Sequence, residues 1–307
     1  MMTNLLKKIL VISLMINTAA SVAQTLPVVN IDMDPKTISL GFVDVVSDNV
    51  ESSVFANPAM MAFSDIQASA ACSYGCWQPN TFKEHRAVIS GSLCITEKLS
   101  VAAGFAGGLG IPYDLYDDYG NHNGQYRPKN YNIKVGSSYK MLPYLSVGLN
   151  VGFIDNIMSL EYSDMAVTTD VFLTSCISDF KFAVGAKNWG FAWNNNGQVL
   201  DDMPIAFSAG GSYSRSLYDI HDVGLYTQYE FMSEDAMATS IGLSYSYSGM
   251  LSLRMGGRLG YGKVQSLLTA GCGISLGSFE INLAYVLPMD EMNLSNTCSL
   301  SLVYLIR

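Results

Sequence analysis

The fold of this protein is decided by a stretch in which small polar and apolar side chains alternate, Ser240-Ile241-Gly242-Leu243-Ser244-Tyr245-Ser246-Tyr247. Side chains on a β-strand point alternately to opposite faces, so this stretch predicts a strand with one apolar and one polar face. The same alternation continues in residues 250–261 and 278–288. The polar row consists mostly of serine and glycine, which suits a crowded barrel interior better than a solvent-covered face.

Units of this kind recur from Ile66 to the end of the sequence, separated by turn residues. This rhythm is typical of outer-membrane β-barrels. A water-soluble β-sandwich has the same period and is the alternative, but it covers its outside with charges, including edge-strand lysines. We count fourteen units, at residues 66–77, 84–96, 98–110, 129–141, 144–155, 165–177, 179–192, 203–215, 220–231, 236–248, 250–261, 264–276, 278–288 and 294–306.

The composition agrees with a membrane environment. The 307 residues carry a net charge of −9, and 49% of them are hydrophobic whereas only 14% are charged. Soluble domains usually contain about 25% charged residues. Nucleic acid is excluded as a partner, because phosphate binding requires clustered cations and here the acids outnumber the bases.

The first residues resemble a secretory signal peptide. Lys7 and Lys8 precede an apolar stretch, and Ser21-Val22-Ala23 has the form of a cleavage site. No apolar run after Ala23 reaches the 18 or more residues of a membrane-spanning helix. An exported apolar chain without such a helix is expected to cross a membrane as a closed barrel. We therefore predict an all-β protein in a Gram-negative outer membrane, with a signal peptide at 1–23, an N-terminal hatch segment at 24–64 and a 14-stranded antiparallel transmembrane β-barrel at 65–307.

The lengths of the connections predict the orientation of the barrel. Connections after even-numbered strands are short, whereas the long ones, 111–128, 156–164 and 193–202, all follow odd-numbered strands. Outer-membrane barrels have short periplasmic turns and longer external loops. The N-terminus is therefore expected on the periplasmic side.

The segment before the barrel does not alternate. Residues 47–56 are predicted to form a short helix, with Asp48 as its cap and Glu51 three residues later, as in a capping box. The helix should end by Asn57, because Pro58 disfavours a helical conformation in the preceding residue. A segment of this length ahead of a barrel is expected to plug its lumen.

Three parts of this segment carry a family resemblance. Met33-Asp34-Pro35-Lys36-Thr37-Ile38-Ser39-Leu40-Gly41, Ser47-Asp48-Asn49 and Asn57-Pro58-Ala59 resemble the opening of the FadL-like outer-membrane barrels. The resemblance implies a fourteen-stranded barrel with a hatch whose motif residues are Gly41, Asp48, Asn57, Pro58 and Ala59. Within the superfamily, residues 34–41 look more like the PorV/PorQ branch of the type IX secretion system.

The resemblance implies two functions. A PorV/PorQ-type barrel is a non-enzymatic part of protein secretion that docks the translocon channel, exported cargo or the surface attachment complex. A FadL-type barrel carries hydrophobic small molecules and binds them in its lumen. Loop 111–128 is polar and acidic, with little apolar surface to capture a lipid, which favours secretion. Outer-membrane lipid surrounds the barrel in either case, and loops 111–128 and 193–202 are the expected docking surface.

An outer-membrane enzyme is the weakest hypothesis. The three histidines, His85, His122 and His221, are too scattered for a zinc site. The acids of loop 111–128, Asp114, Asp117 and Asp118, lack the spacing of a calcium loop and are interpreted as a solvated acidic loop. We expect no catalytic residue, metal or cofactor.

Charged residues on the polar rows are expected in the lumen. These candidates are Lys134, Lys140, Lys181, Glu230, Arg254, Arg258 and Glu280. They could form a charged passage or anchor the acidic hatch at Asp44, Asp48 and Glu51. They could also be ion pairs that only neutralise buried charge, and we favour this interpretation.

The six cysteines are not expected to form an obvious disulfide. Cys72 and Cys76 lie on one strand about 13 Å apart, beyond the disulfide limit of about 7 Å between Cα atoms. Cys272 and Cys298 are interpreted as small hydrophobic residues on apolar rows. Cys94 and Cys176 are left undetermined.

Overall fold

The computed structural model describes residues 34–77, 83–117, 119–200, 203–218, 220–232, 236–262, 264–289 and 297–307. The segment predicted as a signal peptide, residues 1–23, and residues 24–33 of the hatch segment lie outside the described residues.

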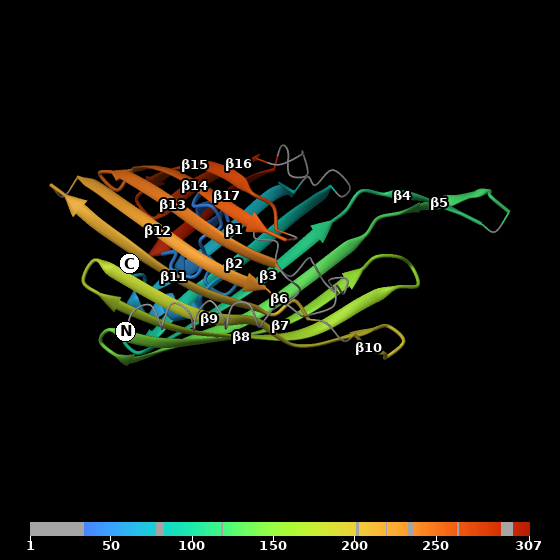
Figure 1. Ribbon diagram of the computed structural model, residues 1–307, viewed down its shortest axis with the longest axis horizontal. Coiled ribbons are helices and arrows are strands. Elements are labelled where there is room, and N and C mark those ends of the chain that lie inside the picture. Colours follow the sequence, from blue (N-terminus) through green and yellow to red (C-terminus); the bar gives the residue numbers. More distant parts are fainter. Residues whose placement is uncertain are drawn as a thin grey trace, which may run out of the picture.

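Fourteen long strands form a closed antiparallel barrel, and each pairs with its neighbour along the chain (Figure 1). The ring closes where the last strand pairs with the first, in a register that sets Ala68 opposite Ile306. The fourteen strands correspond one to one to the predicted units. They are β1 (Ala68–Trp77), β2 (Glu84–Thr96), β3 (Leu99–Leu109), β6 (Lys129–Leu142), β7 (Leu145–Ile157), β8 (Ser163–Ile177), β9 (Phe180–Asn194), β11 (Ala206–Leu217), β12 (His221–Met232), β13 (Ala236–Tyr247), β14 (Leu251–Tyr261), β15 (Leu267–Leu276), β16 (Phe279–Pro288) and β17 (Cys298–Ile306).

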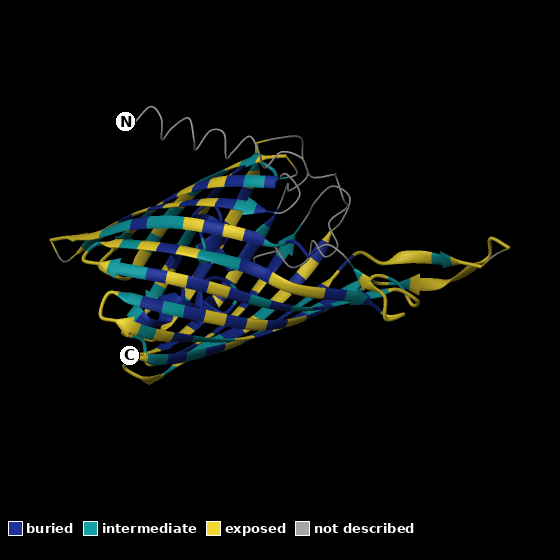
Figure 2. Cartoon of the chain, turned by 60° about the horizontal axis from the view of Figure 1, so that its bottom comes forward, coloured by how far each residue is buried: buried dark blue, intermediate teal, exposed yellow. Residues whose placement is uncertain are grey.

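Burial alternates along the strands with a period of two, as Figure 2 shows. On β13, Ile241 keeps 56% of its surface exposed whereas its neighbour Ser240 keeps 2%. The exposed row is the apolar one and the buried row is the polar one, the reverse of a water-soluble sandwich. This arrangement places the apolar side chains toward lipid, where they need no cover of water-binding groups.

The two ends of the barrel differ. Tight turns close one end, and several of them use left-handed backbone, as at Ser178 (φ 52°), Tyr218 (φ 56°) and Gly277 (φ 63°). The long connections lie at the other end, which in barrels of this class faces the cell exterior.

The long connection at 111–128 corrects one expectation. It is not a plain loop but contains a two-stranded hairpin, β4 (Tyr113–Tyr116) and β5 (His122–Tyr126), that extends far beyond the barrel rim (Figure 1). Loop 193–202 also contains a short strand, β10 (Val199–Leu200), which pairs with β9.

Three short helices lie inside the barrel, α2 (Pro35–Ser39), η2 (Val50–Ser52) and η3 (Pro58–Phe63). They belong to the segment 34–64, which we call the hatch, and they appear in blue within the ring of strands in Figure 1. No helix in the described ranges is long and apolar enough to cross a membrane.

Candidate functional site: the hatch and the barrel interior

The hatch begins with a capped helix. Asp34 precedes α2, and its Oδ2 accepts hydrogen bonds from the backbone nitrogen of Thr37 at 3.0 Å and from Thr37 Oγ1 at 2.9 Å. Pro35 fits the first helical position, where no backbone hydrogen is needed. Asn49 donates its side-chain amide to the same carboxylate, which ties α2 to the next part of the hatch.

The predicted helix over 47–56 is wrong in length and in its cap. Only Val50–Ser52 is helical, as a 3-10 turn, and its N-cap residue is Asn49. The side chain of Asp48 makes an ion pair with Lys181 on β9 instead of closing a capping box. Long-range pairing with the barrel wall outweighs the local cap here.

Gly41 sits where only glycine fits. Its φ is 74°, a conformation that other residues rarely adopt. A Cβ at this position would lie 2.7 Å from the carbonyl oxygen of Gly257 on β14. The backbone nitrogen of Gly41 donates to Thr269 Oγ1 on β15 at 3.0 Å. The hatch backbone therefore rests directly on the barrel wall.

The motif Asn57-Pro58-Ala59 docks the other end of the hatch. Asn57 Oδ1 caps η3 by accepting from the backbone nitrogen of Ala59 at 2.9 Å. The amide of Asn57 donates to the carbonyl of Val45 at 2.6 Å and to Thr174 Oγ1 on β8 at 2.8 Å. Pro58 and Ala59 pack against Gly148 on β7, where any side chain would overlap them. These three residues thus begin the helix η3 and hold it against both the rest of the hatch and the barrel wall.

Polar wall side chains also satisfy the hatch backbone. Gln228 Oε1 on β12 accepts from the backbone nitrogens of Asp44 and Val45 at 2.9 and 3.0 Å. The amide of Asn150 on β7 donates to the carbonyl of Val54 at 2.9 Å. Buried backbone groups are costly when unpaired, so these side chains fix where the hatch can lie.

Ion pairs join the hatch acids to cations. Asp44 pairs with Lys187 and Asp48 with Lys181, both lysines on β9. Lys36 bridges Glu51 of the hatch and Glu280 of β16 at 2.7 Å each. Among the predicted lumen charges, Lys181 and Glu280 thus form ion pairs with hatch residues, Lys181 with Asp48 and Glu280 with Lys36.

Other predicted lumen charges pair within the wall. Arg258 meets Glu230 at 2.7 Å, and Lys134 meets Asp170 at 2.6 Å. These two pairs fit the interpretation that lumen charges neutralise one another. Arg254 donates to Asn282 Oδ1 at 3.1 Å.

Lys140, another predicted lumen charge, contacts an aromatic ring of the hatch. Its ammonium lies 5.5 Å from the ring centroid of Phe63, the last residue of η3, in a cation–π contact.

Sequence reasoning missed four charged wall residues, Glu84, Arg86, Asp170 and Lys187. Glu84 and Arg86 form a buried pair at 3.0 Å on β2, and their spacing of two could have placed them on one face. Asp170 lies at a register irregularity between β8 and β9, and its Oδ1 accepts from the backbone nitrogen of Asn188 at 2.8 Å. No sequence pattern reveals that bulge, which also shifts the register around Lys187.

The electrostatics of the hatch follow from these contacts. Burial alone would lower the pKa of the Lys36 ammonium, but the carboxylates of Glu51 and Glu280 raise that pKa above its usual value. Lys36 is therefore a fixed positive charge that holds two acids together across the hatch and the wall.

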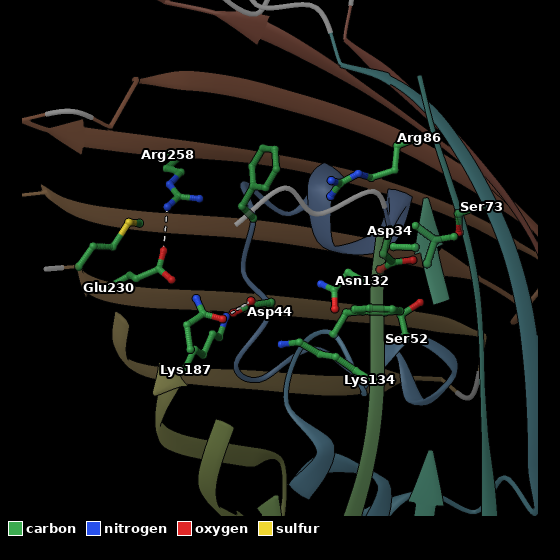
Figure 3. A pocket seen from close by; sticks show the side chains of 16 residues that line it. Asp34, Asp44, Ser52, Ser73, Arg86, Asn132, Lys134, Lys187, Glu230 and Arg258 are labelled. Atoms are coloured by element: carbon green, nitrogen blue, oxygen red, sulfur yellow. Dashed lines mark hydrogen bonds and ion pairs between the residues drawn. The ribbon is translucent and has the colours of Figure 1, made fainter. Parts of the chain in front are cut away.

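The hatch divides the interior into two spaces. On the exterior side a cavity of about 80 Å³ lies among charged groups, and Figure 3 shows the Lys187–Asp44 and Arg258–Glu230 pairs on its border. On the periplasmic side a wider recess of about 520 Å³ is lined by serines and by Lys36, Asp48 and Arg254. Both spaces also have apolar side chains in their walls, such as Phe42 and Met232 around the cavity and Leu40 and Leu305 around the recess.

The contact between hatch and wall contains an apolar seam. Leu40, Val43, Val45 and Val46 of the hatch are buried in one cluster with wall residues that include Phe172 of β8. Two further buried clusters join hatch and wall, one with Ile38 and Phe42 and the other with Val54 and Met61.

Acidic side chains of the external hairpin accept hydrogen bonds from other residues of the hairpin. Hydrogen bonds from Gln125 and His122 lower the pKa of Asp114, and those from Asn121 lower the pKa of Asp117. Asp118 lies outside the described residues. Across the described ranges, no group of three or more His, Cys, Asp or Glu side chains is placed to hold a metal ion.

Comparison with known proteins supports the fold. No known family profile and no curated protein matches the sequence. The toluene transporter TodX of P. putida is 11% identical, with a TM-score of 0.63 over 90% of this chain and 100% of that one. The toluene transporter TbuX of Ralstonia pickettii is 12% identical, with a TM-score of 0.61 over 89% and 97%. A Pseudomonas aeruginosa FadL homologue is 10% identical, with a TM-score of 0.54 over 89% and 98%.

Two of these structures are described as transporters, and none of the three as an enzyme. Their identities are low, so the likeness concerns the fold, and it extends over nearly the whole of each chain. The chain therefore has the fold of the FadL-like outer-membrane barrels.

Proposed function

We propose that this protein carries small apolar molecules across the outer membrane and that the hatch closes the path in the conformation described here. The observation that carries the proposal is a lumen filled by a separate, docked hatch within the fold of toluene transporters. A hatch held by side chains and ion pairs can move while the sheet around it stays intact.

The route for an apolar molecule follows the seam between hatch and wall. The cavity of about 80 Å³ has charged groups such as Lys187 and Arg258 beside Phe42 and Met232, so an apolar solute there would have to displace water from buried charges. Val45 and Val46 pack against Phe172 in the buried apolar cluster, and a small apolar molecule could replace these contacts one for one. Passage then requires residues 40–46 to leave the wall.

Uptake by intact cells tests the proposal. Cells that produce the full chain should take up radiolabelled toluene severalfold faster than cells without it, with no change for glycerol. Val45→Thr makes the seam polar at nearly constant volume and should reduce uptake, whereas Val184→Thr, the same change on the outer face of β9, should not. Equal toluene uptake with and without the protein would contradict the proposal.

Protein docking in type IX secretion is the second candidate, and the external hairpin favours it. Tyr116 and Tyr119 project from the hairpin, and Tyr119 keeps 91% of its surface exposed. Exposed aromatic side chains next to acids suit recognition of another protein better than capture of a lipid. The opening residues 34–41 resemble the PorV/PorQ branch, which agrees with this candidate.

Matched tyrosine variants separate the two candidates. If the hairpin docks secretion partners, Tyr119→Ala should reduce the recovery of the translocon channel with a tagged full chain. Tyr218→Ala removes a tyrosine that is 90% exposed at the opposite end of the barrel, and recovery should not change. Unchanged recovery with both variants, and after removal of residues 111–128, would count against docking.

A further inference from the structure

The pairing of the first and last strands, which closes the barrel, brings two cysteines to opposite positions. The register of β1 and β17 sets Cys76 directly opposite Cys298 at the exterior end of both strands. Both side chains belong to the outward rows of their strands and are half-buried. The sequence reasoning compared Cys76 only with Cys72 on the same strand and did not consider a partner on the last strand.

The spacing of this pair suits a disulfide. Directly opposite residues in antiparallel strands have Cα atoms about 4.5–5.5 Å apart, and disulfides span Cα separations of about 4.4–6.8 Å. Both side chains lie on the same outward face of the sheet, so the two thiols are within reach of each other.

A histidine stands beside the pair. His85 of β2 lies opposite Cys76 on the other side of β1, and its Nδ1 is 3.4 Å from Cys76 Sγ. Tyr74 Oη lies 2.8 Å from the same nitrogen. A neutral imidazole at this distance can accept the thiol proton, and the thiolate is the form that attacks a disulfide.

We propose that Cys76 and Cys298 form a disulfide that joins the first and last strands of the barrel covalently. The oxidant is an external disulfide, carried by a protein or a small molecule. The Cys76 thiol passes its proton to His85, and the thiolate attacks one sulfur of the oxidant and releases the other as a thiol. Cys298 then loses its proton and attacks Cys76 Sγ, and this step expels the second oxidant sulfur as a thiol. Two thiols are oxidised and one disulfide is reduced to two thiols.

The proposed disulfide lies between two strands that the chain does not connect directly. Every other neighbouring pair of barrel strands is connected through the chain within a hairpin, but β1 and β17 are held only by backbone pairing and side chains. Exported proteins meet an oxidising environment in which such bonds persist. The disulfide adds a covalent link between β1 and β17, the one neighbouring pair of barrel strands that no hairpin connects.

Counting thiols in the full chain tests this inference. The protein is isolated from membranes, denatured and alkylated without reductant. Two of its six cysteines should resist alkylation, and the band should run faster on a non-reducing gel because the link makes the denatured chain more compact. Reduction should reverse both effects.

Single substitutions identify the pair. Cys76→Ser and Cys298→Ser should each abolish the fast band, while circular dichroism shows an intact barrel. Cys72→Ser is the control, because Cys72 lies on the same outward row opposite Leu302 and should leave the band unchanged. The inference is overturned if all six cysteines of the wild type are alkylated, both as isolated and after the folded barrel is incubated with oxidised glutathione. A fast band that survives Cys76→Ser would also overturn it.

Discussion

Replacing Lys187 by methionine is expected to lower the free energy of unfolding by about 3–5 kcal/mol, the usual cost of leaving one partner of a buried ion pair alone. Lys187 and Asp44 keep only 11% and 13% of their side chains exposed, so water cannot compensate the lost charge. The Asp44 carboxylate would remain buried at the point where the hatch meets β9. Urea unfolding in lipid vesicles measures the loss, with Trp189 and Trp193 on the same strand as fluorescent reporters.

A double-mutant cycle separates the contribution of this ion pair from other effects of the substitutions on stability. Asp44→Asn combined with Lys187→Met should restore part of the free energy of unfolding that Lys187→Met removes, because no unpaired charge remains. Lys98→Met removes an exposed lysine in the turn between β2 and β3 and should change stability by less than about 0.5 kcal/mol. A loss below about 1 kcal/mol for Lys187→Met, the range of exposed ion pairs, would contradict the anchoring role.

Adding one methyl group at Gly256 is expected to release the hatch. Gly256 on β14 faces inward, and a Cβ there would overlap the backbone nitrogen of Gly41 and the carbonyl carbon of Leu40. Overpacking against side chains costs about 1–3 kcal/mol, and backbone atoms have less freedom to move away. Gly256→Ala should therefore weaken docking while the strands stay paired. Trypsin reports this change, because Lys36 is the one basic residue among residues 34–64 and its side chain is buried when the hatch is docked.

The neighbouring glycine supplies the control for this variant. A Cβ at Gly257 would point outward, and its nearest neighbours would be the Leu268 side chain at 3.4 Å and the carbonyl oxygen of Leu267 at 3.8 Å. Gly257→Ala should leave cleavage at Lys36 as slow as in the wild type, whereas Gly256→Ala should make it several times faster. Equal cleavage of the two variants would show that the hatch does not rest on β14 as described.

The barrel could be predicted from sequence because its signals are local. Alternation with a period of two and a turn residue at each end fix a strand without knowledge of its partners. The fourteen strands and the side of the tight turns followed from this information, and Ser178, Gly249 and Gly277 lie in short connections after even-numbered strands. The rim hairpin β4–β5 was missed because its strands are only four and five residues long and neither shows the alternation of the barrel strands.

The interior could be predicted only in part, because its contacts join residues far apart in the chain. Asp48 satisfies a local capping rule, yet it pairs with Lys181. Asn49 donates its side-chain amide to the carboxylate of Asp34, a role that an ionised acid could not fill. The bulge near Asp170 and the partner of Cys76 depend on register between strands, which the sequence does not reveal.

Lipid accessibility along β13 tests the central claim most directly, namely that the apolar rows face lipid around an interior filled by the hatch. Spin labels would be placed one at a time at residues 240–247, in a variant whose six cysteines are replaced by serine. The labels at 241, 243, 245 and 247 should collide with oxygen dissolved in the bilayer, and those at 240, 242, 244 and 246 should be shielded from it. Oxygen accessibility without a period of two, or with the two rows exchanged, would contradict the account.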